Sequence, residues 1–271
     1  MPSLSLPHAT LDYDLSGPPA DSTRPLVVQL HGLTSSRTRD AELGLDLAER
    51  VGVHPVLRYD TRGHGRSTGE DDERSYQWPS LADDLMALLE AVPAGSVHGV
   101  GQSMGAGTLL HAAVRAPERF ASLVLGIPPT AWQTRVTQRE GYLENARLVA
   151  SEGVEALVSQ TSRTAAPPAV DGNRRPTRPA VRPELLPTVF RGAAGTDLPD
   201  AGSIRALTMP TLVLAWVDDP AHPLSTAQRL HALMPASRLV VARTPADVAQ
   251  WPDLVADHVA GNTQRLPTAG G

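Results

Sequence analysis

Continuous apolar runs alternate with helical stretches along most of this chain, and this alternation limits its fold more than any other feature. The apolar runs cover residues 25–30, 55–60, 96–100, 122–127, 211–217 and 238–242. Runs of this kind are typical of parallel strands that are buried on both faces. Between them, stretches such as residues 79–92 carry leucines at helical spacing, and two short alternating runs over residues 3–16 predict an edge hairpin. We therefore predict an α/β fold with a doubly wound, mostly parallel sheet.

The alternation of strands and helices stops in the middle of the chain. Residues 133–162 predict two helices, and the proline- and arginine-rich residues 165–183 predict a loop, before the strand pattern resumes at residue 211. The sequence therefore predicts an α/β core made of residues 1–127 and 210–271. A helical lid is expected to be inserted at residues 128–209.

The composition of the chain excludes several kinds of chemistry. With no cysteine among 271 residues, it has neither a thiol nucleophile nor a thiolate metal site. Every basic side chain other than histidine is arginine, so Schiff-base chemistry on lysine is excluded. The net charge of -5 is mild, and we expect no nucleic-acid or membrane partner. We expect a cytoplasmic protein with a small-molecule substrate and no metal or organic cofactor; the oligomeric state stays open.

The segment Gly101-Gln102-Ser103-Met104-Gly105 predicts a reactive serine. It lies between the apolar run at residues 96–100 and the helix formers of residues 106–114. Strand, sharp turn and helix form the context of a G-x-S-x-G nucleophile elbow. The flanking glycines avoid collisions across the strained turn, and the helix that follows points its free N–H groups toward the serine.

Four features in register resemble the α/β-hydrolase family, and the resemblance covers nearly the whole chain. His31-Gly32 follows a predicted strand, and residues 60–67 match the family's D-x-R-G-x-G-x-S turn. The Ser103 elbow is the third feature, and Asp218-Asp219 after the resumed strand is the fourth. All four lie at the carboxyl ends of predicted strands, where open α/β sheets gather their sites.

This resemblance implies a role for each of the matching residues. Ser103 would be the nucleophile, and the backbone N–H groups of Leu33 and Met104 would form the oxyanion hole. Asp219 would be the acid that orients a histidine. We also expect His31, Trp132 and Trp216 to contact the substrate.

The histidine that the family places after its last strand is missing from that position. The corresponding loop, residues 243–252, contains no histidine, and Asp247 falls near the expected place. His258 lies too far along the chain, on a predicted helix. A bulky Trp216 also stands where the family commonly has glycine before the acid. The sequence therefore predicts either a different base, with Asp247 as the candidate, or no base, and His222 is interpreted as structural or as lining the pocket.

Three hypotheses about function follow from this pattern. The first is a small-molecule hydrolase of an ester, thioester or lactone that uses Ser103 with a non-standard or missing base. The second is a non-hydrolytic enzyme, such as a lyase or cyclase, that uses the oxyanion hole with Asp219 and Asp247. The third is a binding protein that has lost catalysis.

Overall fold

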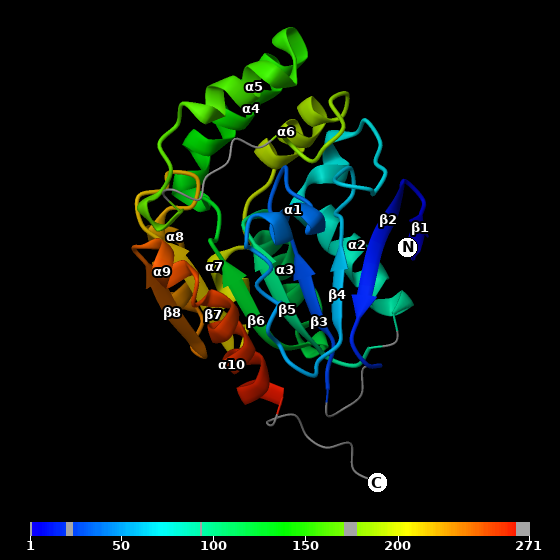
Figure 1. Ribbon diagram of the computed structural model, residues 1–271, viewed down its shortest axis with the longest axis vertical. Helices are drawn as coiled ribbons and strands as arrows, with labels where there is room; N and C mark the ends of the chain where they lie inside the picture. The colour runs from blue at the N-terminus through cyan, green and yellow to red at the C-terminus, as the bar shows by residue number, and fades with distance from the viewer. Residues whose placement is uncertain (1, 20–23, 93, 171–177, 264–271) are drawn as a thin grey trace.

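The computed structural model describes residues 2–19, 24–92, 94–170 and 178–263, and its strands form one sheet (Figure 1). The strands are β1 (Ser3–Leu6), β2 (Ala9–Ser16), β3 (Val27–Leu30), β4 (Val56–Tyr59), β5 (Val97–Gln102), β6 (Phe120–Gly126), β7 (Thr211–Trp216) and β8 (Ser237–Ala242). Their order is β1-β2-β4-β3-β5-β6-β7-β8. Strands β3 to β8 are parallel, whereas the β1–β2 hairpin joins the edge of the sheet antiparallel to β4. The doubly wound, mostly parallel sheet and the edge hairpin are both confirmed.

Helices cover both faces of this sheet. They are α1 (Arg37–Glu42), α2 (Trp78–Ala91), α3 (Met104–Arg115), α4 (Arg135–Glu152), α5 (Val154–Ser162), α6 (Leu186–Ala194), α7 (Ala201–Arg205), α8 (Leu224–Leu233), α9 (Pro245–Val248) and α10 (Trp251–Thr263). Successive strand residues point to opposite faces, so Leu123 of β6 joins the apolar cluster under α2, α3 and α8, whereas Val124 joins the cluster under α10. No helix within the described ranges is long and apolar enough to cross a membrane.

The segment between β6 and β7 adds helices at one end of the sheet, where α4, α5 and α6 lie together at the top of Figure 1. Their apolar side chains form a cluster of their own, which includes Val149, Leu157 and Phe190. By contrast, Leu198 and Ile204, which come later in the same segment, pack into the main cluster of the sheet. The packing therefore places the last residues of the predicted lid with the α/β core.

Two local expectations differ from the structure. The charged and apolar residues of 38–51 predict one helix, but α1 ends at Glu42, because Gly44 turns the chain with a φ of +68° and residues 45–51 continue mostly as turns. Helix α9 occupies part of the loop expected after β8; it begins at Pro245 and is capped by Thr244. Of the loop expected over residues 165–183, residues 171–177 lie outside the described part of the chain.

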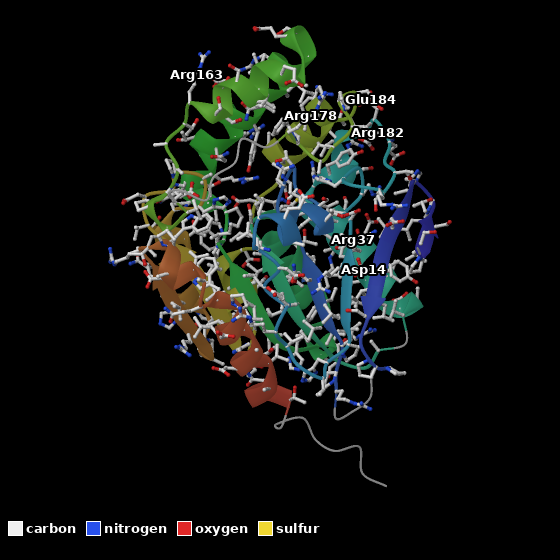
Figure 2. All side chains as sticks on the ribbon, viewed as in Figure 1. Asp14, Arg37, Arg163, Arg178, Arg182 and Glu184 are labelled. Carbon is white, nitrogen blue, oxygen red and sulfur yellow. The ribbon has the colours of Figure 1, made fainter. Side chains whose placement is uncertain are left out.

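A buried arginine forms ion pairs with both the edge hairpin and the carboxyl end of a central strand. Arg37 of α1 forms an ion pair with Asp12 of β2, and its Nε lies 3.0 Å from the Asp14 carboxylate (Figure 2). Its NH1 lies 3.6 Å from the carboxylate of Asp60, which follows β4. Burial raises the pKa of Asp14, although the charge of Arg37 opposes this shift. The cluster holds the loops around the candidate site against the edge of the sheet.

Candidate active site

Ser103 lies on a strained turn between β5 and α3. Its φ of 51° and ψ of -112° lie where side chains are rarely found. The neighbouring glycines are required, because a Cβ at Gly105 would lie 2.5 Å from the carbonyl oxygen of Leu30. The Ser103 N–H donates to the carbonyl oxygen of Gly126 at 3.0 Å, which ties the turn to β6. The geometry is that of the nucleophile elbow expected from the sequence.

A chain of hydrogen bonds joins Ser103 to the loop between β7 and α8. Ser103 Oγ lies 2.8 Å from His222 Nε2, and His222 Nδ1 lies 2.8 Å from Asp219 Oδ2. A carboxylate only accepts hydrogen bonds, so Nδ1 carries the proton and Nε2 accepts from the serine hydroxyl. The structure therefore brings Ser103, His222 and Asp219 together.

The Asp219–His222 loop is a tight turn that holds both side chains. The His222 N–H donates to the carbonyl oxygen of Asp219 at 3.2 Å, and the Ala221 N–H donates to Asp219 Oδ1 at 2.9 Å. Asp218, just before it, has a φ of +59° that turns the chain away from β7. Because the Ala221 carbonyl oxygen accepts from Thr130 N at 3.1 Å, the turn is also held by the segment after β6.

The Asp219 carboxylate is stabilised in its ionised form. Burial is the largest influence and would raise its pKa, but hydrogen bonds from His222, Trp216 and Ala221 outweigh it. Together with the charge of His222 they lower the pKa of Asp219 to about 2. Trp216 Nε1 donates to Asp219 Oδ2 at 2.8 Å, the same oxygen that accepts from His222.

Two backbone amides, one in the loop after β3 and one at the elbow, lack an internal acceptor among the described residues. Over the described residues, the N–H groups of Leu33 and Met104 have no hydrogen-bond partner in the protein. The Leu33 loop approaches the elbow closely, since a Cβ at Gly32 would lie 3.5 Å from Ser103 Cβ. His31 fixes this loop: its Nδ1 bonds the Gly32 carbonyl oxygen at 2.8 Å, and its Nε2 accepts from Thr61 N at 3.0 Å. Burial lowers the pKa of His31 to about 4, so the ring stays neutral.

A cavity of about 330 Å³ opens onto this site. Its lining residues come from the elbow, the two loops and the inserted helices: Leu33, Thr34, Ser103, Gln138, Tyr142, Asn145, Leu157, Val158, Thr161, Pro179, Phe190, Ala221 and His222. Helices α4, α5 and α6 supply the wall opposite Ser103. In the part of the chain that the structure describes, no group of three or more His, Asp or Glu side chains could hold a metal ion.

The structure moves four expected site residues out of this cavity. Asp247, the expected substitute for histidine, is half-buried in α9, and its carboxylate accepts from Arg243 N at 2.8 Å and Thr244 N at 2.9 Å. His31, expected to contact substrate, is buried beneath the Leu33 loop. The Trp132 indole Nε1 donates to Pro199 at 3.2 Å, and the Trp216 indole Nε1 donates to Asp219. These expectations are corrected, because none of the four residues lines the cavity.

His222 is interpreted from the sequence as structural or as lining the pocket, but in the structure it bonds Ser103. The family pattern directs attention to the loop after the last strand, and His222 lies before α8 instead. The available signal is the spacing Asp219-Pro220-Ala221-His222, because residues three apart in a turn can bring their side chains together.

Comparisons with known proteins place this geometry in a family. A family model described as alpha/beta hydrolase fold matches residues 25–254. The chain is 30% identical over 171 residues to an sn-1-specific diacylglycerol lipase, ABHD11, of Xenopus tropicalis, covering 57% of this chain and 52% of that protein. It is 38% identical over 121 residues to the rhodomycin D methylesterase DauP of Streptomyces sp. (strain C5), covering 44% of this chain and 39% of that protein.

The aligned regions thus span about half or less of these two curated relatives. Among solved structures, the enol-lactonase from Burkholderia xenovorans LB400 has a TM-score of 0.77 at 20% identity, covering 95% of this chain and 99% of that chain. At this identity the structural similarity concerns the fold alone. The family model, however, matches most of the sequence. The chain belongs to the alpha/beta hydrolase fold family.

Proposed function

We propose that this protein hydrolyses an ester, thioester or lactone of a small molecule. In this proposal Ser103 is the nucleophile, His222 is the general base, and Asp219 orients His222. The observation that carries it is the pair of 2.8 Å hydrogen bonds from Ser103 Oγ to His222 and from His222 to Asp219. A serine hydroxyl is a weak nucleophile at neutral pH, and this arrangement supplies the base that it needs.

The geometry supports a two-step acyl transfer. Ser103 Oγ attacks the carbonyl carbon while His222 Nε2 takes the hydroxyl proton, and the carbonyl oxygen becomes an oxyanion. The N–H groups of Leu33 and Met104 donate to that oxyanion, and one such donor contributes about 3 kcal/mol to transition-state stabilisation. His222 then gives the proton to the leaving group. In the second step water attacks the acyl carbon while His222 Nε2 takes its proton, and the bond to Ser103 Oγ breaks as His222 returns that proton to the serine, which releases the acid.

The cavity and the relatives indicate the substrate class. A volume of about 330 Å³ lies at the small end of ligand sites, which favours a small acyl group. The relatives named as a lipase and a methylesterase act on esters by name, which favours an oxygen ester over the other acyl compounds. The lyase, cyclase and binding-protein hypotheses rested on the missing base. That reason falls away with His222 bonded to Ser103.

A labelling experiment tests the proposal. We expect a fluorophosphonate probe to label the wild-type protein on Ser103, as located by mass spectrometry, and to abolish hydrolysis of p-nitrophenyl acetate. The Ser103→Ala variant should lose both labelling and hydrolysis while its melting temperature stays close to that of the wild type. Hydrolysis that survives in Ser103→Ala would overturn the proposal.

A further inference from the structure

Trp216 occupies an unusual position beside the acid of the site. It is the last residue of β7, it pairs with Ala242 of β8, and its side chain is buried. Its indole stacks on that of Trp251, with ring centroids 5.8 Å apart and an interplanar angle of 20°. It also stands edge-on to His222 at 6.1 Å and 80°. The ring is therefore held by the sheet and by α10 rather than by the Asp219–His222 loop.

The indole N–H of Trp216 reaches the carboxylate from this fixed position. It donates to Asp219 Oδ2 at 2.8 Å, and His222 Nδ1 donates to the same oxygen at 2.8 Å. Asp219 Oδ1 accepts a local bond, from Ala221 N at 2.9 Å, within the same turn. In this hydrogen-bond set, Trp216 is the donor that connects the carboxylate to the sheet.

We infer that Trp216 is a positioning residue of the proposed hydrolase, which fixes Asp219 Oδ2 so that His222 faces Ser103. The inference rests on the proposed function. The acid and the base share one short turn, so a rotation of the Asp219 carboxylate would displace the imidazole directly. A donor anchored in β7 prevents that rotation. Because Trp216 does not line the cavity, it acts on the substrate only through Asp219 and His222.

A simpler explanation is that any buried indole N–H takes whichever acceptor is near. The stacked partner argues against it. Trp251 Nε1 is buried and, within the described residues, has no hydrogen-bond partner. Packing of this indole pair therefore does not require that both N–H groups be bonded, and the bond from Trp216 to Asp219 is a separate feature.

The bond also sets how strongly Asp219 attracts the imidazole proton. His222 is the titratable side chain that bonds the carboxylate, whereas the neighbouring Asp218 is exposed. A donor on Oδ2 withdraws electron density that would otherwise hold the imidazolium proton. Without it, the carboxylate holds the protonated imidazole more tightly.

Matched variants of the two stacked tryptophans test the inference. Trp216→Phe removes the bonded N–H, whereas Trp251→Phe removes an N–H that has no partner, and both keep an aromatic ring. For Trp216→Phe we expect kcat to fall roughly tenfold, KM to stay within about twofold, and the acid limb of the pH–rate profile to move to higher pH. For Trp251→Phe we expect wild-type kcat and pH profile. The inference is overturned if the two variants behave alike.

A spectroscopic measurement tests the same bond without using activity. In 1H–15N spectra, Asp219→Asn should move the indole peak of Trp216, because a carboxamide accepts a weaker hydrogen bond than a carboxylate. The peak of Trp251 should not move. If Trp216→Phe does not fold, Phe variants of Trp78, Trp132 and Trp251 assign the Trp216 peak by elimination.

Failure of the Trp216 inference and failure of the proposed function give different results. A Trp216 peak that Asp219→Asn leaves in place overturns this inference, whatever the activity. Hydrolysis that survives in Ser103→Ala overturns the proposed function, and the spectra still report whether Trp216 holds Asp219.

Discussion

Two neighbouring loops at the carboxyl edge of the sheet both contain an aspartate, and they differ in what that aspartate binds. In the loop after β7, Asp219 accepts from His222, which in turn bonds Ser103. In the loop after β8, Asp247 accepts from the backbone N–H groups of Arg243 and Thr244 and caps α9. The side chain of Asp219 is 13% exposed beside the cavity, and Asp247 is half-buried in α9, away from the cavity.

A lowered pKa is common to both carboxylates, although their hydrogen-bond partners differ. Hydrogen bonds lower the pKa of both aspartates: from Arg243 and Thr244 for Asp247, and from His222, Trp216 and Ala221 against burial for Asp219. In one case the donors are local backbone groups that complete a helix cap. In the other, one donor is the His222 side chain, which also bonds Ser103. The partner of the carboxylate, and not its acidity, separates the two loops.

The short Asp219–His222 turn changes what is required of the neighbouring loop after β8. Because Asp219 and His222 are three residues apart, one loop supplies both groups of the hydrogen-bond chain to Ser103. The hydrogen-bond chain to Ser103 is then complete without a side chain from the loop after β8. Its short helix and capping aspartate are compatible with a purely structural role.

Among substitutions in the two loops, replacing His222 is expected to lower kcat the most. We expect His222→Ala to lower kcat by roughly 10⁴-fold or more, because Ser103 loses the group that accepts its proton. Asp247→Ala should keep activity within about twofold of the wild type. Steady-state hydrolysis of p-nitrophenyl acetate measures both.

The paired result also decides between the two loops. If Asp247→Ala lost as much activity as His222→Ala, the loop after β8 would contribute to catalysis, and the division described above would fail. Comparable melting temperatures for the two variants exclude unfolding as the cause of any loss.

Much of this architecture could be predicted from the sequence, because apolar runs and turn glycines report on local backbone and burial. The strands, the hairpin and the Ser103 elbow were predicted in this way, and so was the break in the alternation after β6. Helix α9 was not predicted, because it is only four residues long and depends on the Thr244 cap.

The partner of Ser103 could not be predicted by the same means. Whether the side chains of Asp219 and His222 meet depends on the backbone angles of one turn, including a positive φ at Asp218. No periodicity encodes those angles. The direction of the Trp216 indole depends likewise on its stacking against Trp251, which is 35 residues away in the chain.

Replacing the acid is expected to have the next largest effect. Asp219→Asn keeps the shape of the side chain but removes its charge, and its amide can present a donor to His222 Nδ1. We expect kcat to fall by roughly 10²- to 10⁴-fold, with little change in KM, because the imidazole is then held in the wrong tautomer. The matched control is Asp218→Asn at the exposed neighbour, which should retain activity; a large loss there would assign the acid role to Asp218.

The lowered pKa of Asp219 predicts a pH dependence of stability. The pKa of Asp219 falls from 3.8 to about 2 on folding, so its ionised form stabilises the folded state above pH 3.8 and this contribution is lost as the pH falls toward 2. It amounts to about 2 kcal/mol at pH 6, and about half of it is gone at pH 3. Urea unfolding at pH 3, 4 and 6 measures the difference between the wild type and Asp219→Asn. A difference that stays constant over this range would contradict the lowered pKa.

The smallest expected effect is on kcat of the His222→Ala variant when a histidine is added in the loop after β8. Adding Asp247→His to His222→Ala places a histidine where the family usually carries one. We expect the double variant to remain as inactive as His222→Ala, because residue 247 lies in α9 with its side chain turned back toward Arg243 and Thr244. His222→Ala carrying Asp247→Asn is the control for loss of the cap. Recovery of about 100-fold or more in kcat with Asp247→His, and not with Asp247→Asn, would show that the loop after β8 can still reach Ser103. The two loops would then be alternative sources of the base, with the shorter route through Asp219 and His222 in use.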